Sequence, residues 1–271
     1  MSDTGQLTAT AAEIYDEFFV PALFGAWPPR LADAAGIGSG MRVIDVACGT
    51  GILALEAARR AKPDGSVVGI DLNPGMLAVA RRKDPAIDWR EAAAERLPLP
   101  DADADAVVSQ FGLMFFADQR QAIREMWRVL RPGGHLVVAV WDKVENAPGY
   151  AAVITILDRL FGREIGDLLR APYSLGDPDA LHALFKSAGV TDAKVTRAPG
   201  EARFPSIRSW AHTDVRGWTL ADKLDDAQFE RFAAEADIEL RRFVTDDGTV
   251  RFFHPALIVT ATKRGVASRD A

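Results

Sequence analysis

The sequence predicts an α/β protein with a doubly wound, seven-stranded and mostly parallel sheet of the Rossmann-like type. The first observation is a mostly apolar run at residues 43–46 that is followed at once by Gly49 and Gly51. Runs of this kind are typical of buried parallel strands, and a glycine turn leading into a helix opens a doubly wound unit. The second is that strand and helix patterns alternate five times up to Trp141. Such alternation favours a parallel sheet with helices on both faces.

The elements of the first half follow from the spacing of apolar residues and from the prolines and glycines. Apolar residues three and four apart predict helices over residues 11–34, interrupted near Pro21 and at Pro28-Pro29. Pro74 stands at a first helical position, and Pro132-Gly133-Gly134 ends a later helix. The predicted strands are 43–46, 66–70, 88–91, 104–109 and 135–141, and the predicted helices between them are 52–60, one from Pro74 through Val79, and 121–130.

The pattern changes after Asp142. We expect helices at 152–169 and 177–186, a strand at 193–196, a largely helical block at 207–243, and two strands at 249–253 and 256–262. Because the last strand follows a helical block, we interpret residues 205–243 as a C-terminal helical cap insertion over the ligand edge of the sheet. The expected organisation is therefore N-terminal helices over residues 1–40, a cofactor-binding core over 41–142, and a C-terminal part over 143–271 that completes the sheet and carries the cap.

The composition excludes several classes of protein. The 271 residues are 48% apolar, enough for one large domain or one domain with an insertion. A net charge of -6 with only short basic clusters argues against a nucleic-acid groove. One cysteine cannot form an internal disulfide, and the four histidines lack the spacing of a metal site, so no metal is expected. With no long apolar run and no signal-peptide pattern, we expect a cytoplasmic protein without a membrane span. The oligomeric state stays open.

The glycine turn and the acid that ends the next strand indicate a nucleoside cofactor. Asp71 follows Gly51 by 20 residues, where a carboxylate can accept the two hydroxyls of a ribose. The alternative for Asp71 is a helix N-cap. NAD(P) and S-adenosylmethionine both fit such a turn, and charge separates them. Asp45, four residues before Gly49, would repel a pyrophosphate and stabilise a cationic amino-acid group. The sequence therefore favours S-adenosylmethionine.

Four motifs in order also carry a family resemblance. Together they resemble the class I S-adenosylmethionine-dependent methyltransferases, in particular the branch of the ubiquinone/menaquinone-biosynthesis methyltransferases. The resemblance spans about residues 15–141 and is specific for fold and cofactor rather than for substrate. The motifs are Val-Ile-Asp-Val-Ala-Cys-Gly-Thr-Gly at 43–51, Gly-Ile-Asp-Leu-Asn-Pro-Gly-Met-Leu at 69–77, Ala-Glu-Arg-Leu-Pro-Leu-Pro-Asp at 94–101 and Arg-Val-Leu-Arg-Pro-Gly-Gly at 128–134.

The resemblance implies a role for each matching position. Residues of the first motif would hold the methionine end of the cofactor, and Asp71 would hold the ribose. Other residues would border the adenine or lie beside the transferable methyl. The residues are Asp45, Ala47, Gly49 and Gly51 for the methionine end, Leu72, Met76, Ala94 and Glu95 for the adenine, and Gln110 and Phe111 beside the methyl. Relatives often have an acid at the position of Ala93, so that Glu91 or Glu95 substitutes here or the contact is missing. Cys48 is interpreted as a small packing residue rather than a nucleophile.

Two further candidates lie outside these motifs. Tyr15, on the first helix, would hydrogen-bond the methionine carboxylate as aromatic hydroxyls do in similar proteins, or it is a half-buried core residue. His212 lies in the cap between Trp210 and Trp218, and it is the best candidate for a substrate-facing general base. The alternative for His212 is a histidine that only packs.

The sequence as a whole predicts a methyltransferase that uses S-adenosylmethionine to methylate a small, partly apolar molecule by direct transfer. The sulfonium is an activated donor, so the protein's main task is to align the acceptor and exclude water. Two alternatives stay open at this point. One is an NAD(P)-dependent oxidoreductase, and the other is an S-adenosylmethionine-binding protein without turnover.

Overall fold

The computed structural model describes residues 9–216, 220 and 223–264. The contacts between residues divide this part of the chain into two compact units. The first, here called the sheet unit, comprises residues 27–140, 178–196 and 258–264. The second, here called the aromatic unit, comprises residues 9–26, 141–177 and 197–257.

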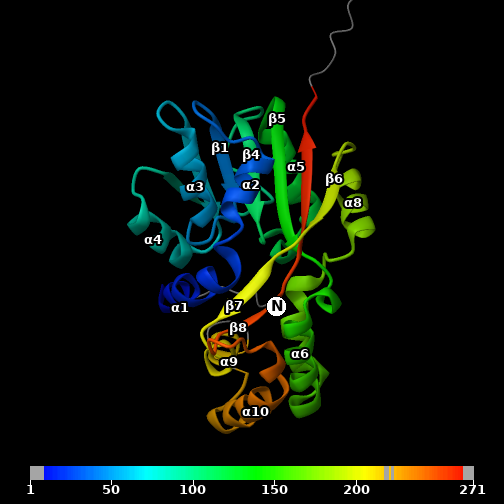
Figure 1. Cartoon of the computed structure of the whole chain (residues 1–271). Helices are drawn as coiled ribbons and strands as arrows, with labels where there is room; N and C mark the ends of the chain where they lie inside the picture. Colours follow the sequence, from blue (N-terminus) through cyan, green and yellow to red (C-terminus); the bar gives the residue numbers. More distant parts are fainter. Residues whose placement is uncertain (1–8, 217–219, 221–222, 265–271) are drawn as a thin grey trace, which may run out of the picture. The chain divides into compact units, whose positions relative to one another are not determined.

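A seven-stranded sheet organises the sheet unit, in the order β3-β2-β1-β4-β5-β9-β6 (Figure 1). The first five of these strands are parallel to their neighbours, which confirms the predicted fold class. The strands are β1 (Arg42–Val46), β2 (Ser66–Asp71), β3 (Asp88–Glu91), β4 (Ala104–Gln110), β5 (Leu130–Trp141), β6 (Lys194–Ala198) and β9 (Ala256–Thr262). The chain steps from β1 toward β3 and then returns to the other side of β1 with β4, so that the strand order reverses between β1 and β4. Ligands of doubly wound proteins bind at such a reversal, beyond the carboxyl ends of the strands.

The sheet unit also contains helices, one before β1 and the others between strands. They are α2 (Pro28–Ala34), α3 (Ile52–Ala61), α4 (Pro74–Lys83), the 3-10 turn η2 (Leu113–Phe115), α5 (Gln119–Val129) and α8 (Pro178–Ser187). Right-handed crossovers place α3 and α4 on one face of the sheet and α5 on the other. Buried apolar residues of α5 point to the core, while Asp118 caps its first turn by accepting a hydrogen bond from the Gln121 N–H at 2.9 Å.

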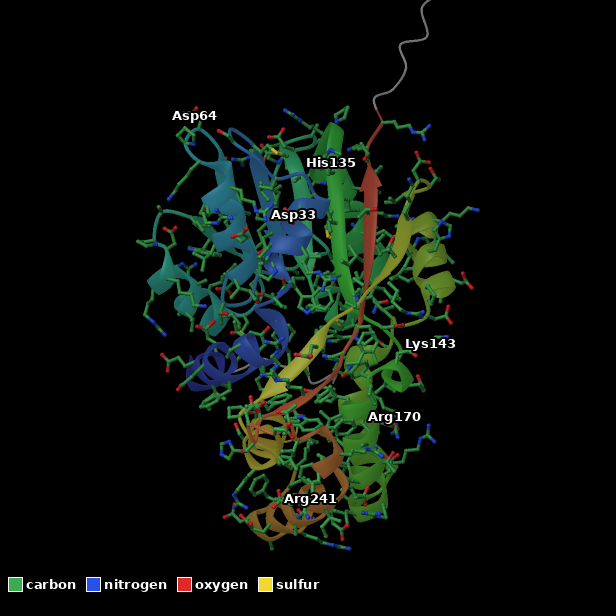
Figure 2. All side chains as sticks on the ribbon, viewed as in Figure 1. Asp33, Asp64, His135, Lys143, Arg170 and Arg241 are labelled. Atoms are coloured by element: carbon green, nitrogen blue, oxygen red, sulfur yellow. The ribbon has the colours of Figure 1, made fainter. Side chains whose placement is uncertain are left out.

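Strand β5 begins five residues earlier than the sequence predicts. Helix α5 already ends at Val129, and Pro132-Gly133-Gly134, which was expected to end it, lies within β5. Leu130 pairs with Ala104, and the register then shifts before His135 pairs with Ala106. The Gly133 N–H donates to the Lys263 carbonyl at 2.6 Å, which compensates for the irregular pairing. His135, labelled in Figure 2, lies within hydrogen-bond distance of Thr262 (3.2 Å) and has a structural place in the sheet.

The aromatic unit combines short helices with a two-stranded antiparallel sheet. Its elements are α1 (Ala9–Ile14), the π-helix η1 (Tyr15–Phe24), η3 (Val144–Asn146), α6 (Pro148–Phe161), α7 (Arg163–Arg170), η4 (Ala171–Tyr173), β7 (Glu201–Phe204), α9 (Ile207–Arg216), α10 (Asp226–Glu239), η5 (Arg241–Phe243) and β8 (Val250–Phe253). Helices α9 and α10 lie within the helical block expected at 205–243. Residues 217–219 and 221–222, Trp218 among them, lie outside the described part.

Two sequence expectations in this unit are wrong, and one strand was not predicted. Pro21 does not interrupt a helix, because the chain forms a π-helix that contains it. The single helix expected at 152–169 is two helices, since Gly162 adopts φ 90 between α6 and α7. Strand β7, which pairs antiparallel with β8, was not expected, because only Ala202 and Phe204 alternate in its four residues.

A buried network of aromatic and polar side chains fills the core of the aromatic unit. The Trp210 indole N–H donates to Asp214 at 2.7 Å, and the Tyr150 hydroxyl donates to the other oxygen of Asp214 at 3.2 Å. The Tyr173 hydroxyl lies 2.9 Å from Nε2 of His254, and the His254 ring stacks on Trp141 at a centroid distance of 4.0 Å.

Burial shifts the pKa values of Asp214 and His254 in opposite directions. It raises the pKa of Asp214 to about 7, although the hydrogen bonds from Trp210 and Tyr150 act against the shift. It lowers the pKa of His254 to about 3, so that the imidazole is neutral in the folded protein at ordinary pH.

We expect the Asp214→Asn variant to lose part of the pH dependence of folding stability. Between the unfolded pKa near 4 and the folded value near 7, the native state keeps a proton on Asp214 that the unfolded state has lost, so stability falls as pH rises through this window. The shift corresponds to roughly 4 kcal/mol at most. Asparagine cannot ionise, and its amide can accept from Trp210 and donate to the Tyr150 oxygen.

Urea unfolding of both proteins from pH 4 to pH 8 checks this prediction. His254 has the opposite effect on the pH slope, because its folded pKa is depressed, but it is present in both proteins and cancels in the difference. The free energy of unfolding of the variant, relative to that of the parent, should increase steadily up to about pH 7. Parallel stability profiles would show that Asp214 does not hold a proton in the folded chain.

Candidate functional site

The carboxyl ends of the central strands bring the predicted cofactor residues to one edge of the sheet unit. Asp45 on β1 pairs in register with Gly69 of β2 and Val108 of β4, and Asp71 pairs with Glu91 of β3. The segments that follow these strands therefore leave the sheet next to one another.

The backbone of the glycine turn is in the left-handed conformation at alternate positions. Ala47, Gly49 and Gly51 have φ 56, 54 and 87. A Cβ at Gly51 would lie 2.5 Å from the Trp89 ring, whereas one at Gly49 would project into open space. At position 51, glycine is needed because the backbone is left-handed and because a side chain would collide with the Trp89 ring. At position 49, glycine suits the left-handed backbone and leaves the space next to the turn open.

The turn leads directly into helix α3. Gly51 occupies the N-cap position, and no side chain caps the helix there. The first N–H groups of a helix carry partial positive charge and are available to an anionic or polar ligand group.

Asp45 is a buried carboxylate without a close hydrogen-bond partner among the described residues. Its side chain belongs to a residue that is 1% exposed, and neither oxygen accepts a hydrogen bond from any described residue. Burial raises the pKa of Asp45 well above its usual range, the charge of Asp71 adds to the shift, and the backbone of Ala54 opposes it. Leaving such a group unpaired is costly, so the site is complementary to a ligand that brings positive charge.

Asp71 is held by backbone amides on both sides. Its Oδ2 accepts from the Gly49 N–H and its Oδ1 from the Asn73 N–H, each at 2.8 Å. Burial raises the pKa of Asp71 in spite of these bonds. Each carboxylate oxygen has a second lone pair, so that Asp71 can still accept two hydroxyls.

The helix N-cap considered for Asp71 is in fact Asn73. The Asn73 side chain accepts from the N–H groups of Gly75 at 2.8 Å and Met76 at 3.2 Å. The Asn-Pro pair that starts α4 is a recognisable N-terminal signal, so this residue could have been found in the sequence.

The other predicted cofactor residues of the sheet unit lie around the same edge. Leu72 is 49% exposed beside Asp71, and Met76 is half-buried in the first turn of α4. Ala94 is buried in the loop after β3, and Glu95 next to it accepts from the Asp118 N–H at 3.1 Å. Glu91 is exposed on β3. Glu95 is therefore partly committed to the start of α5.

Gln110 and Phe111 end β4 opposite the glycine turn. Phe111 is buried with φ 55, and its ring lies edge-on to Trp27 at 5.4 Å. A Cβ at Gly112 would lie 2.5 Å from the Cβ of Ala47, so the segments after β1 and β4 approach closely. Left-handed backbone at both Ala47 and Phe111 is typical of a functional site.

Cys48 is a packing residue at this edge. It is buried, and burial together with the charges of Asp71 and Asp45 raises the pKa of its thiol well above the usual range. A protonated thiol is a poor nucleophile, in agreement with the sequence interpretation.

Tyr15 and His212 belong to the aromatic unit, and their roles stay predictions. The Tyr15 ring stacks on Phe19 and Phe24 at 5.9 and 5.4 Å. His212 is exposed on α9, with its ring edge-on to Phe229 at 6.2 Å. Trp210, which precedes it in the expected cap, is fully buried in the aromatic core. Sequence reasoning missed the Asp214 network, because single polar residues far apart in the chain give no local pattern.

The described residues contain no group of His, Cys, Asp or Glu side chains that could hold a metal ion. Among the helices described, none is long and apolar enough to cross a membrane.

Comparison with known proteins identifies the sheet unit. Residues 44–138 match the Methyltransferase domain family. The demethylmenaquinone methyltransferase of Thermus thermophilus is 39% identical over 185 residues, which cover 62% of this chain and 84% of that protein. An uncharacterized protein of Mycobacterium tuberculosis is 42% identical over 246 residues, covering 87% and 86%. The matches to four further quinone-biosynthesis methyltransferases cover only 48% to 61% of their lengths.

The fold has solved counterparts. Phosphoethanolamine N-methyltransferase 2 of Haemonchus contortus, solved with phosphomonomethylethanolamine and S-adenosylhomocysteine, has a TM-score of 0.61 at 19% identity over 96% of this chain and 58% of that one. This likeness concerns the fold alone. The domain match and the Thermus relative decide between the two cofactors left open by the glycine turn, in favour of S-adenosylmethionine. The chain belongs to the class I S-adenosylmethionine-dependent methyltransferases, in the branch of the ubiquinone/menaquinone-biosynthesis enzymes.

Proposed function

We propose that this methyltransferase acts on a small, partly apolar ring that bears a hydroxyl or an activated carbon, of the quinol type. The observation that carries the methyl-transfer part is Asp45, a buried carboxylate whose oxygens find no hydrogen-bond donor among the described residues. The acceptor class is supported by the name of the Thermus relative, a demethylmenaquinone methyltransferase. Neither a nucleic-acid partner nor a metal is part of the proposal, and a cytoplasmic location remains a prediction from the sequence.

The residues of the sheet edge fit S-adenosylmethionine. Asp45 would hold the ammonium of the methionine end, with the turn from Ala47 to Gly51 around it, and Asp71 would accept the ribose hydroxyls. Leu72, Met76, Ala94 and Glu95 would border the adenine, while Gln110 and Phe111 would lie beside the methyl. When bound, the cofactor supplies a sulfonium-activated methyl group. The residues of the chain bind it, orient it and keep water away.

Two residues of the aromatic unit extend the proposal. Tyr15 would donate a hydrogen bond to the methionine carboxylate, and His212 would accept the proton that a hydroxyl or carbon acid loses on methylation. The helices α9 and α10 would serve as the cap that selects the acceptor.

The cofactor and the reaction can be tested together. Calorimetry should show micromolar binding of S-adenosylhomocysteine and no binding of NADH, because a pyrophosphate would meet the carboxylates of Asp45 and Asp71. Methyl-labelled donor, incubated with a demethylated quinol and with a panel of phenols and amines, should label the quinol. Tight NADH binding would refute the cofactor assignment, whereas donor binding without any labelled product would favour a binding protein without turnover.

We expect Asp45→Asn to increase folding stability and to weaken the binding of S-adenosylhomocysteine. The amide keeps the shape of the side chain and removes a buried carboxyl group whose ionisation is costly, so as pH rises the free variant should become more stable than the parent, by about 1 to 3 kcal/mol. Affinity for S-adenosylhomocysteine should fall about tenfold or more, because the ammonium loses its counter-charge. Thermal melts and calorimetry measure the two effects.

The pH dependence of binding provides a second readout for Asp45. The folded pKa is raised, so the parent should bind S-adenosylhomocysteine more tightly as pH increases and Asp45 ionises. Asp45→Asn should lack this rise. Asp71→Ala is the matched comparison, since it should also lose tenfold in affinity but keep a rise of affinity with pH, which is displaced to lower pH because the charge of Asp71 no longer raises the pKa of Asp45. An Asp45→Asn protein that binds like the parent at every pH would place the ammonium elsewhere.

His212→Gln tests the proposed base. Cofactor affinity should remain within twofold, and turnover of a hydroxylated acceptor should fall by roughly 10²-fold. Turnover with an unchanged rate and pH profile would remove His212 from the mechanism and leave alignment as the source of catalysis.

A further inference from the structure

One face of helix α5 holds the irregular segment that follows β3. Gln121, Glu125 and Arg128 are spaced by four and three residues, so their side chains lie on the same side of the helix. All three bond to residues 95–101, within the segment between β3 and β4. We call this segment the 92–101 loop and the three side chains the α5 clamp.

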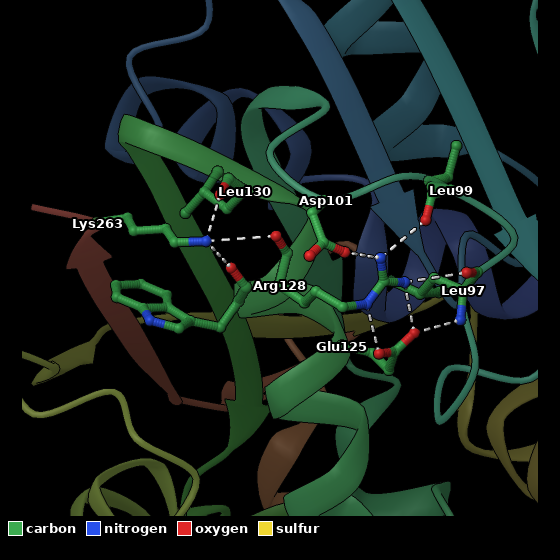
Figure 3. Close-up of polar contacts among 8 residues, drawn as sticks. Leu97, Leu99, Asp101, Glu125, Arg128, Leu130 and Lys263 are labelled. Atoms are coloured by element: carbon green, nitrogen blue, oxygen red, sulfur yellow. Dashed lines mark hydrogen bonds and ion pairs between the residues drawn. The ribbon is translucent and has the colours of Figure 1, made fainter. Parts of the chain in front are cut away.

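Arg128 and Glu125 carry most of the contacts (Figure 3). The Arg128 guanidinium donates to the carbonyls of Leu97 at 3.2 Å and Leu99 at 2.9 Å and to the Asp101 carboxylate at 2.7 Å. It also bonds both oxygens of Glu125, at 2.7 Å each, and Glu125 in turn accepts from the Leu97 N–H at 2.9 Å. One planar guanidinium thus connects two carboxylates and two loop carbonyls, which a lysine cannot reproduce.

The start of α5 fixes the upstream half of the loop. The Gln121 amide donates to the Glu95 carbonyl at 3.3 Å, and the Asp118 N–H donates to the Glu95 carboxylate at 3.1 Å. Glu95 and its neighbour Ala94 are therefore positioned from α5 rather than from the strand that precedes them.

The far end of α5 is itself secured. The Lys263 ammonium donates to the carbonyls of Trp127, Arg128 and Leu130 at 2.6, 3.3 and 2.6 Å (Figure 3). The Arg128 carbonyl also accepts from the Ala102 N–H at 3.1 Å. Glu125 is only 12% exposed and Arg128 30% exposed, so solvent weakens this network less than it would weaken a surface ion pair.

The strand order indicates what the loop faces. Asp45 lies on β1, Asp71 ends the neighbouring strand β2, and the loop leaves the next strand, β3. The Ala92 N–H donates to the Asp71 carbonyl at 3.1 Å, so the loop begins directly beside Asp71. A nucleoside whose amino-acid end lies at Asp45 and whose ribose lies at Asp71 extends its base in the direction of this loop.

We propose that the α5 clamp is a positioning device that fixes the 92–101 loop against the purine ring and thereby sets the preference of the protein for adenine. This inference rests on the proposed placement of the cofactor at Asp45 and Asp71. Gln121, Glu125 and Arg128 act through the loop and do not touch the ligand.

The experiment measures base selectivity rather than activity. Calorimetry compares S-adenosylhomocysteine with S-inosyl-L-homocysteine, in which a carbonyl replaces the purine amino group. The parent should prefer the adenine compound. In Arg128→Lys and Glu125→Gln, affinity for S-adenosylhomocysteine should fall about tenfold, while affinity for the inosyl compound falls by less than threefold, so that the preference shrinks.

Arg60→Met is the matched control. Arg60 also bonds two carboxylates, Glu56 at 2.6 Å and Asp33 at 2.5 Å, and a backbone carbonyl, that of Pro29 at 3.0 Å. It lies in the last turn of α3, and the three groups that it bonds lie outside the loop. Its removal should cost stability and leave the ratio of the two affinities within twofold of the parent.

Hydrogen exchange locates the effect, and it keeps the test decisive if one variant folds poorly. The amides of Leu97 and Ala102 should exchange at least tenfold faster in the clamp variants but not in Arg60→Met. Gln121→Ala, which removes only the bond to the Glu95 carbonyl, is the mildest variant and should show the same loss of preference on a smaller scale.

Two results would contradict the proposed role of the α5 clamp in base selectivity. A loop that exchanges faster with an unchanged adenine preference would limit the α5 face to a structural role, and so would an equal change of preference in Arg60→Met. A parent protein that fails to bind S-adenosylhomocysteine at all would refute the cofactor placement itself, and the clamp with it.

Discussion

The carboxylate of Asp45 is the constraint around which the sheet edge is arranged. It lies on a strand whose three apolar residues belong to the core, and burial without a partner is among the most costly states for an ionisable side chain. The folded protein tolerates it because β1 is paired on both sides and cannot rotate the side chain toward solvent without giving up its place in the sheet. A ligand that brings positive charge converts this cost into affinity, and the free protein therefore holds the site in a state that favours binding.

The backbone around Asp45 is arranged to leave room for such a ligand. Gly49 and Gly51 turn the chain away from the strand, and the Trp89 ring fills the space beneath Gly51. Asp71 then fixes the turn from the side, because one of its oxygens accepts from Gly49 and the other from Asn73. The same carboxylate that would meet the ribose thus also links the first glycine turn to the start of α4, and a change at Asp71 affects both.

The sequence predicts most of this edge because its signals are local. An apolar strand, a glycine pair and an acid at the end of the next strand lie within 30 residues, and each pattern favours one interpretation. What the sequence does not predict depends on distant partners. Strand β5 starts at Leu130 because Ala104 is there to pair with it, and β7 exists because β8 offers its edge 50 residues later. The π-helix at Pro21 and the network around Asp214 are likewise decided by packing rather than by periodicity.

The distinction between local motifs and long-range contacts also separates the features that this protein shares with its family from the features that are particular to it. The match to the Thermus quinone methyltransferase covers 62% of the chain, whereas the match to the M. tuberculosis protein covers 87%. In the proposed function the sheet edge would recognise a cofactor shared by a whole family, and this would require few residues beyond Asp45, Asp71 and the glycines. The aromatic unit has no comparable local motif, and its core is a set of long-range contacts. Because an acceptor is recognised by shape and by a few placed polar groups, its identity is encoded in such long-range contacts, and sequence motifs describe them least well.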